Sequence, residues 1–533
     1  MRQTGPHRDG TRCWKINRVN ELPPTIPVLL ARCVREFGDA TYVVSPDDRL
    51  TYREADSRAA DIACWLLHQG VGKGSRVGLF FTNGVDWILW WLAVSRIGAL
   101  AVPLSTLYRP AELAKVVRLA DVGILVAPAR FLGVDVAERF EAAWPQLSVQ
   151  LAGRLALRDA PYLRNIVLVA DTDRNWATTF GASDATPAEL LPAVESEVAA
   201  ADLAIMVHTS GSTADPKGVL HTHGTLVRQT STWASAVSAI SHAEPPLTIL
   251  CAMPFFWVGG VLAAMGALHE PVTLLVMPRL DAGAALDLVE QERASGIVGW
   301  PAFTQKLRAH PSFADRDLTS APMLRDGPLD IAMTDVPDGF PVHRTMTETA
   351  GGFGFTELKI VDDDGRPVAD GDVGELLIRG IGVMAGYNKR ERWETFDDDG
   401  WYHTGDRVYR RDAEPRDPRL FYVGRTTELI KSAGANVSPV EVEGVIVDCP
   451  EVAQCVVIGI DHHERGEEVC AVVVPATGDF DVETAVAYTR DQLSAYKVPT
   501  RWVITVGDQI PTLPSGKFDR RALRELIIGG VLG

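Results

Sequence analysis

A run of ten residues carries the side chains best suited to hold a phosphate chain: Thr209-Ser210-Gly211-Ser212-Thr213-Ala214-Asp215-Pro216-Lys217-Gly218. It follows an apolar stretch at residues 203–207. Hydroxyl groups interleaved with glycine offer O–H donors and closely spaced backbone N–H groups, and Lys217 adds a positive charge. The pattern indicates a loop that wraps a triphosphate. A surface loop of the same composition is the alternative that remains open at this point.

Other chemical signatures are incomplete or absent. Gly72-Lys73 and Gly516-Lys517 lack the earlier glycine and the following Ser/Thr of a Walker loop. The GxGxxA run at residues 380–385 has no convincing helix after it to supply an N-terminus for a dinucleotide. No GxSxG nucleophile elbow occurs. P-loop, dinucleotide and serine hydrolase chemistry are therefore disfavoured.

Two groups of residues suggest metal ions at first sight. The acidic runs at 362–365 and 397–400 lack the alternating ligand spacing of a calcium loop, so we expect plain turns. Two histidine pairs, His462 with His463 and His221 with His223, have no carboxylate or cysteine companions at ligand spacing. We expect these histidines to lie solvated in turns and at a helix start.

Composition restricts the class of protein and its partners. The 533 residues are 46% hydrophobic and 23% charged, which predicts a globular chain of roughly three to five structural units. Lysine and arginine number 52 against 69 acidic residues, and the formal charge of −17 disfavours nucleic acid as a partner. A polyanionic ligand must therefore be held by locally placed cations and N–H groups.

Cysteine usage and the apolar stretches predict a cytoplasmic protein. The seven cysteines are scattered and form no CxxC pair, which favours a reduced, metal-free interior. Residues 1–20 are polar and lack the apolar core of a secretory signal. Residues 87–104 and 255–268 are the most apolar stretches, but one contains Arg96 and the other is short, so we expect buried core and no transmembrane segment.

The chemical residues must be positioned by a largely parallel sheet. Apolar residues from Tyr52 to Leu66 recur at helical spacing, and strands at 76–81, 99–104 and 122–127 alternate with helices at 85–97 and 111–119. From residue 371 short β segments such as 374–379 follow. After Gly424 a compact α+β unit is predicted, with strands 455–460, 469–474 and 501–506 and a helix 482–493.

Five motifs in order resemble the AMP-forming adenylating enzymes, a superfamily of acyl-CoA synthetases, aryl-CoA ligases, luciferases and peptide-synthetase adenylation domains. The loop at 209–218 is the first and Met346-Thr347-Glu348-Thr349 the second. The others are Gly374-Glu375-Leu376 through Gly386-Tyr387, then Gly400 to Asp406, then Gly424-Arg425 through Glu441-Val442-Glu443, and Pro514-Ser515-Gly516-Lys517 closes the chain in the same manner. Together they cover residues 50–523, and the chain looks most like a bacterial fatty-acyl-CoA ligase.

The resemblance implies an α/β fold in two parts. Residues 1–424 would form a large N-terminal region of helix-covered sheets plus a β-rich subdomain. Residues 425–533 would form a small mobile α+β domain. A homodimer is compatible with this organisation, as is peripheral membrane contact if the acid is long-chain.

The resemblance also implies residue roles. Thr209, Ser210, Gly211, Ser212, Thr213 and Lys217 would contact the β- and γ-phosphates of ATP. Thr347 would reach the α-phosphate, and Glu348 would hold Mg²⁺. Asp406, helped by Arg425, would bind the ribose. Lys517 would stabilise charge in the adenylation transition state.

The resemblance also implies positions for coenzyme A and for the acid. The loop from Lys431 to Gly434 would replace Lys517 in the second step and line the pantetheine channel, where glycine permits close approach. Phe256 and Trp257 would line the substrate pocket. Trp257 occupies a position where many relatives have histidine.

Several positions depart from the family pattern: Ala214 replaces a loop glycine, Arg344-Thr345 replace an aromatic residue and a glycine, and Thr427 replaces the usual hinge residue. The stretches 325–344 and 349–374 are short for the family. The expected function is an ATP-dependent acyl-CoA ligase that activates a fatty or other lipophilic acid through acyl-AMP. An acyl-AMP ligase that loads a carrier protein, and a binding homologue without turnover, remain as alternatives.

Overall fold

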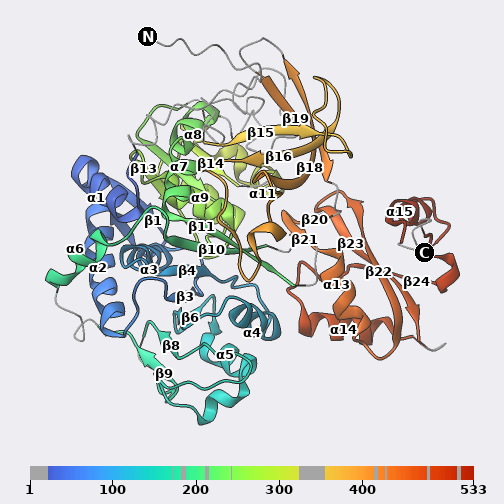
Figure 1. The fold of residues 1–533 in the computed structure, drawn as a ribbon, viewed down its shortest axis with the longest axis horizontal. Coiled ribbons are helices and arrows are strands. Elements are labelled where there is room, and N and C mark those ends of the chain that lie inside the picture. Colours follow the sequence, from blue (N-terminus) through green and yellow to red (C-terminus); the bar gives the residue numbers. More distant parts are fainter. Residues whose placement is uncertain are drawn as a thin grey trace.

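The structure is a computed structural model of the chain, drawn in Figure 1. It describes residues 22–170, 172–181, 188–209, 215–241, 243–299, 301–322, 324, 355–412, 418–425, 429–476, 480–512 and 518–532. The predicted site residues Ser210, Gly211, Ser212, Thr213, Thr347, Glu348 and Lys517 lie outside these ranges. So do Ala214, Arg344, Thr345 and Thr427.

An eight-stranded sheet carries the N-terminal half, with strand order β17-β11-β10-β4-β3-β5-β8-β9. The strands from β10 to β9 in this order are parallel, whereas β10, β11 and β17 pair antiparallel. Their bounds are β3 Arg76–Leu79, β4 Leu100–Pro103, β5 Ile124–Ala127, β8 Asn165–Leu168, β9 Ala177–Thr179, β10 Leu203–Thr209, β11 Lys217–Thr222 and β17 Gly386–Tyr387. The predicted parallel sheet is therefore confirmed.

Both faces of this sheet are covered, which explains its almost continuous apolar strands. Ile124 and Val126 point into a core shared with α1 (Ile26–Phe37), α2 (Tyr52–His68) and α3 (Val85–Arg96). Leu125 and Ala127 point into a second core shared with α4 (Pro110–Leu119) and α5 (Val136–Ala143). The alternation follows from the period of two along a strand.

A second sheet of five strands packs against the first core from the other side. Its order is β14-β12-β13-β1-β2, with bounds β1 Thr41–Val44, β2 Arg49–Thr51, β12 Leu247–Cys251, β13 Val272–Leu275 and β14 Gly296–Val298. Its outer face is covered by α10 (Ala282–Gln291) and α11 (Pro301–Arg308). Four further helices join the layers: α6 Leu191–Ser196, α7 His223–Thr230, α8 Trp233–Ser241 and α9 Val258–Gly266.

The predicted change to short β segments is also confirmed. A four-stranded antiparallel sheet has the order β15-β16-β18-β19, with bounds β15 Glu357–Val361, β16 Gly374–Arg379, β18 Tyr402–Asp412 and β19 Pro418–Arg425. Asp362 and Asp397 accept hydrogen bonds from nearby backbone amides, as expected for plain turns. Figure 1 shows this sheet at the upper right of the molecule, with α11 below it.

The last part of the described chain, which we call the C-terminal unit (residues 429–532), has its own sheet. The order is β21-β20-β23-β22, and β24 pairs with β23. The bounds are β20 Ile430–Ser432, β21 Ala435–Val437, β22 Val452–His462, β23 Gly466–Pro475 and β24 Arg501–Ile504. One face is covered by α13 (Pro439–Val447) and by residues from the end of α14 (Val482–Gln492), and the other by α15 (Arg520–Ile528).

The sequence-based elements agree with the structure to within a few residues at their ends. The apolar stretch at 87–104 is buried core, since every residue of α3 except Asp86 is buried. No helix in the described ranges is long and apolar enough to cross a bilayer. The α/β fold class, with a β-rich subdomain and a smaller α+β unit, is thus confirmed.

Candidate active site

Two predicted phosphate-binding residues face each other where β10 and β11 meet. Thr209 ends β10, Lys217 begins β11, and the two are paired in the antiparallel register. Because β10 runs parallel to β4, Thr209 lies at the carboxyl edge of the parallel strands. Ligands of doubly wound sheets bind at this edge. The fold therefore places both ends of the predicted phosphate loop where a ligand is expected.

The base of this loop is held from two sides. The Lys217 ammonium lies 5.3 Å from the ring centroid of Tyr387 on β17. Asp215 forms an ion pair with Lys115 of α4 at 2.6 Å. Gly218 passes so close to Met206 that an added Cβ would lie 2.6 Å from its sulfur. This crowding explains why a glycine follows Lys217.

A bulge in β18 forms the second part of the site. Glu375 of β16 pairs with Arg407, but Leu377 pairs with His403, so residues 404–406 stand opposite Leu376 alone. Such bulges re-aim side chains and are common beside active sites. The Thr404 hydroxyl donates to the Leu376 carbonyl at 2.6 Å and accepts from the Asp406 amide at 3.0 Å. Gly405 provides the required positive φ of 72°.

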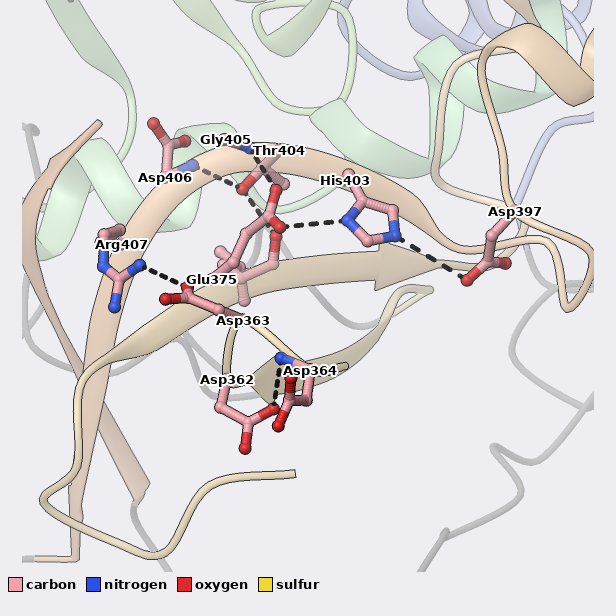
Figure 2. Close-up of polar contacts among 11 residues, drawn as sticks. Asp362, Asp363, Asp364, Glu375, Asp397, His403, Thr404, Gly405, Asp406 and Arg407 are labelled. Atoms are coloured by element: carbon pink, nitrogen blue, oxygen red, sulfur yellow. Dashed lines mark hydrogen bonds and ion pairs between the residues drawn. The ribbon is translucent and has the colours of Figure 1, made fainter. Parts of the chain in front are cut away.

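Glu375 ties this bulge together, as Figure 2 shows. Its Oε1 accepts from the Gly405 amide at 3.0 Å, and its Oε2 lies 3.0 Å from Nδ1 of His403. The Nε2 of His403 lies 3.9 Å from Asp397. The Asp406 carboxylate points away from Glu375, on the other side of the strand. Glu375 thus fixes the backbone that presents Asp406.

Arg425 and Asp406 are brought together by strand pairing. They are Cα partners in the antiparallel register of β18 and β19. Cα partners of this kind place the two backbones side by side at the end of the ladder that joins β18 and β19.

Lys431 and Gly434 lie in a tight hairpin of the C-terminal unit. Ser432 pairs with Ala435, and the two residues between them have positive φ, 51° at Ala433 and 83° at Gly434. This conformation is that of a type I′ turn. The Lys431 amide donates to Glu467 at 2.7 Å, and the Lys431 side chain is exposed. The glycine is therefore explained by its backbone conformation.

Phe256 and Trp257 lie just before α9. Phe256 is buried, Trp257 is half-buried, and their rings meet edge to face at 5.5 Å. The Asn83 side chain fixes this segment, since its amide donates to the Met253 carbonyl at 2.8 Å and its oxygen accepts from the Phe255 amide at 2.7 Å. Trp257 also contacts the Tyr496 ring of the C-terminal unit at 6.5 Å.

The expectation of solvated histidines is wrong for His223. This residue begins α7 as predicted, but it is fully buried, and its Nδ1 accepts from the Ile26 amide at 3.4 Å. Burial lowers the pKa of His223 to about 4. The sequence pattern missed this because α1, which buries the ring, is distant in the chain. His463 is exposed, as expected.

A metal site built by the protein alone is not found within the described ranges. They contain no group of three or more His, Cys, Asp or Glu residues that could hold an ion. The proposed Mg²⁺ ligand Glu348 lies outside them. An ion carried in by a triphosphate needs only one protein carboxylate, so the residues present are compatible with Mg²⁺ in that form.

Several residues of the site were not singled out from the sequence. Glu375 belongs to a quoted motif but had no role, because its contact with Gly405 depends on the bulge. The residues that join the C-terminal unit to the rest of the chain carry no local sequence signal, since their partners are hundreds of positions away: Glu112, Ser494, Tyr496 and Lys497. Glu441 belongs to a quoted motif, but its bond to Lys497 was not predicted.

Comparisons with known proteins agree with this arrangement. A family model described as AMP-binding enzyme matches residues 30–325 and 331–388, and a model of the AMP-binding enzyme C-terminal domain matches residues 441–517. A methyl-dioxo-octahydro-indenyl propanoyl:CoA ligase of Mycobacterium tuberculosis is 31% identical over 95% of this chain and 100% of its own.

Two further matches span most of the chain. The long-chain-fatty-acid–CoA ligase FadD13 of the same organism is 28% identical over 90% of this chain and 94% of its own. Among solved structures, the amide bond synthetase McbA from Marinactinospora thermotolerans matches with a TM-score of 0.71 and 23% identity, over 93% of this chain and 99% of its own. At that identity the likeness shows the fold alone.

Proposed function

The chain belongs to the AMP-binding enzyme family and is an adenylate-forming acid–CoA ligase, and we propose that its acid is lipophilic, either fatty or ring-bearing. In the first step a carboxylate oxygen attacks the α-phosphorus of ATP, and the bond to the β-phosphate breaks to release pyrophosphate. In the second step the thiol sulfur of coenzyme A attacks the acyl carbonyl. AMP then leaves, and the thiol proton passes to solvent.

The observation that carries the proposed site is the pairing of Thr209 with Lys217 at the carboxyl edge of the large sheet. Both ends of the phosphate loop leave this edge side by side. We assign Thr209, Ser210, Gly211, Ser212, Thr213 and Lys217 to the β- and γ-phosphates. Lys217 supplies a fixed positive charge there, and the hydroxyls and amides donate hydrogen bonds.

The bulge in β18 supports a ribose-binding role for Asp406. Its carboxylate points away from Glu375 in Figure 2, on the other side of the strand. An ionised carboxylate accepts two hydrogen bonds from neighbouring hydroxyl groups. We assign Asp406 to the ribose hydroxyls and Arg425, its strand partner, to the same end of the nucleotide.

The remaining catalytic roles stay proposals based on the family motifs. Thr347 donates to the α-phosphate, and Glu348 holds Mg²⁺. When bound, Mg²⁺ neutralises charge on the phosphate oxygens. Lys517 donates to the oxygens that gain negative charge during adenylation, where a fixed ammonium is most effective.

The hairpin at Lys431–Gly434 and the aromatic pair Phe256 and Trp257 are assigned to the second substrate and the acid. The backbone of the hairpin at Gly434 is exposed and carries no side chain, so a pantetheine arm can pass close to it. Phe256 presents an apolar ring in a segment fixed by Asn83. The names of the two relatives, one with a ring system and one with a long chain, support a lipophilic acid for this pocket.

The unit boundary, the cellular location and the oligomeric state are also proposals. We propose a boundary after residue 424, one residue before the end of β19 at Arg425 and ahead of β20 of the next sheet, which begins at Ile430. A cytoplasmic location is supported by the six described cysteines, all of them free and buried. Light scattering would test a homodimer, and limited proteolysis would test the boundary.

A pyrophosphate-release screen tests the proposed function. Short, long, aromatic and sterol-derived carboxylates would each be supplied with ATP, with and without coenzyme A. We expect release with lipophilic acids and thioester formation only when coenzyme A is present. Release followed by acyl transfer to a carrier protein but not to coenzyme A would favour the alternative acceptor. No release with any acid would indicate a binding homologue.

A further inference from the structure

A buried ammonium joins the C-terminal unit to the N-terminal sheet. Nζ of Lys497 donates to Glu112 Oε1 at 2.8 Å and to Glu441 Oε1 at 2.7 Å. The three side chains are only 4%, 8% and 9% exposed, for Lys497, Glu112 and Glu441 respectively. Glu112 lies in the first turn of α4, and Glu441 lies in the first turn of α13. The contact therefore crosses from one part of the protein to the other.

The segment around Lys497, residues 494–497, makes further contacts across the same boundary. The Ser494 hydroxyl lies 3.0 Å from the Leu107 carbonyl and 2.7 Å from Glu112 Oε2. The Tyr496 ring contacts Trp257 edge to face. We call this group the docking segment. It follows α14 and precedes β24, and it packs on α4 and on Trp257, the residue before α9.

The charges of this cluster depend on one another. Burial alone would lower the pKa of the Lys497 ammonium, but Tyr496, Glu441 and Glu112 outweigh that effect and raise the pKa. The lysine is therefore charged at neutral pH. Loss of the Glu112 carboxylate removes the bonds from Lys497 and Ser494 that cross the boundary, while Lys497 stays paired with Glu441 inside the C-terminal unit. It thus disfavours the docked arrangement, because hydrogen bonds to a charged acceptor stabilise that arrangement.

Tyr496 of the docking segment and Phe518, the residue after Lys517, pack on opposite faces of the C-terminal sheet. Phe518 packs with α15 against one side of the C-terminal sheet, in a cluster with Val456 and Ile458. Cys455 and Val457 point to the opposite side, which carries α13 and Tyr496 of the docking segment. Figure 1 shows α15 on the outer side of the C-terminal sheet, away from β10 and β11. The docked arrangement thus keeps the residue after Lys517 away from the phosphate loop.

We propose that Lys497 is a positioning residue that holds the C-terminal unit in the arrangement used for attack of the thiol, through its bond to Glu112. This inference rests on the proposed function, in which Lys517 serves only the first step. Breaking the bond shifts the population of docked molecules, because the two arrangements differ in this contact. The second half-reaction slows, and the first does not.

The test uses the full-length protein and two separate assays. Pyrophosphate release from ATP and the best acid of the screen, without coenzyme A, measures the first step. Thioester formation from chemically prepared acyl-AMP of that acid and coenzyme A measures the second. Glu112→Gln removes the charge across the boundary but leaves Lys497 paired with Glu441, so folding of the C-terminal unit is preserved. Lys497→Met removes both contacts, and Lys497→Arg keeps the charge.

We expect Glu112→Gln and Lys497→Met to slow thioester formation by about tenfold or more, with pyrophosphate release within about twofold of the parent. Lys497→Arg should restore part of the second step. The matched control is Lys73→Met, which removes a lysine paired with Asp202 at 2.8 Å far from the boundary. It should change neither step. Equal slowing of both steps, or an unchanged second step, would overturn the proposal.

A second readout separates this inference from the proposed function. If the parent releases no pyrophosphate with any acid, the proposed function fails, but docking can still be measured by small-angle X-ray scattering. Glu112→Gln and Lys497→Met should then increase the radius of gyration relative to the parent and to Lys73→Met. An unchanged radius would reject a role for Lys497 in docking.

Discussion

The amide of Gly405 donates a hydrogen bond to Oε1 of Glu375 at 3.0 Å, across a bulge in which three residues of β18 stand opposite one residue of β16. This bond fixes the turn that presents Asp406. Glu375 has no place in the proposed chemistry and acts only through the backbone of its neighbour. It is therefore a positioning residue, and its effect should differ from that of Asp406 itself.

Removal of the Glu375 carboxylate should weaken ATP binding without abolishing it. A hydrogen bond to a charged group contributes about 1.5–3 kcal/mol, and its loss should raise the KM for ATP by about tenfold or more. Glu375→Ala would be measured by pyrophosphate release at varied ATP. Glu357→Ala, which removes a carboxylate paired with Arg379 in the same sheet, is the control and should keep the parent KM. Equal effects of the two changes would assign Glu375 to general stability.

The Asp406 carboxylate should matter more, because it is proposed to contact the nucleotide. Two hydrogen bonds to a charged acceptor contribute about 3–6 kcal/mol together, so Asp406→Ala should weaken ATP binding by about a hundredfold or more. Binding of ATP would be followed by calorimetry on the folded variant. A binding constant equal to that of the parent would reject the ribose assignment.

Trp257 should control either the acid or the approach of coenzyme A. Its ring contacts the rings of Phe256 and Tyr496. Trp257→Ala therefore removes a contact inside the N-terminal part and a contact with the C-terminal unit. We expect a shift of preference toward larger acids or a changed KM for coenzyme A. Tyr496→Ala removes only the contribution of the C-terminal unit and should alter the coenzyme A dependence alone. Parent-like profiles in both variants would make Trp257 a core residue.

Lys517 and Gly434 should affect opposite half-reactions. An oxyanion-stabilising donor contributes about 2.7–4 kcal/mol, so Lys517→Ala should slow adenylate formation by about 10²-fold or more. The same variant should convert chemically prepared acyl-AMP to thioester at near the parent rate. Gly434→Leu should do the reverse, since its backbone has a φ of 83° and a side chain there would obstruct the pantetheine arm. If folded Lys517→Ala lost both half-reactions equally, this would contradict the proposal that Lys517 acts only in adenylate formation.

Stability should fall on mild acidification because of His223. Burial lowers the pKa of His223 to about 4 from its ordinary 6.5, so the unfolded chain binds more protons than the folded chain between these values. Stability from this group is therefore present at neutral pH and is lost as pH falls through 6.5 toward 4. Between pH 7 and pH 5 the loss is about 2 kcal/mol.

Thermal unfolding at pH 7 and pH 5 would measure this effect. His223→Gln should have a smaller difference between the two midpoints than the parent, even if it is less stable overall. His463→Gln, at an exposed turn, is the matched control and should keep the parent difference. An identical pH response in all three proteins would show that His223 does not contribute to it.

Local patterns in the sequence were sufficient for most of the elements and for the class of chemistry. The alternation of strands with helices and the helix spacing from Tyr52 to Leu66 predict the layered sheet, because they depend on neighbours in the chain. Thr209, Lys217 and Asp406 could be named because each lies in a short motif. For Gly434 the sequence predicts only close approach of the backbone, and the structure adds the turn with its positive φ.

Contacts between distant segments could only be decided by the tertiary structure. The sequence indicates that His223 begins a helix, but α1 determines that the ring is buried. Glu375 holds the bulge only because β16 pairs with β18 in one register. Lys497 and Glu112 are 385 positions apart, and each alone resembles an ordinary surface charge. Their desolvation and pairing arise only when the C-terminal unit docks on α4, since the strength of a charge contact depends on surroundings that local sequence does not specify.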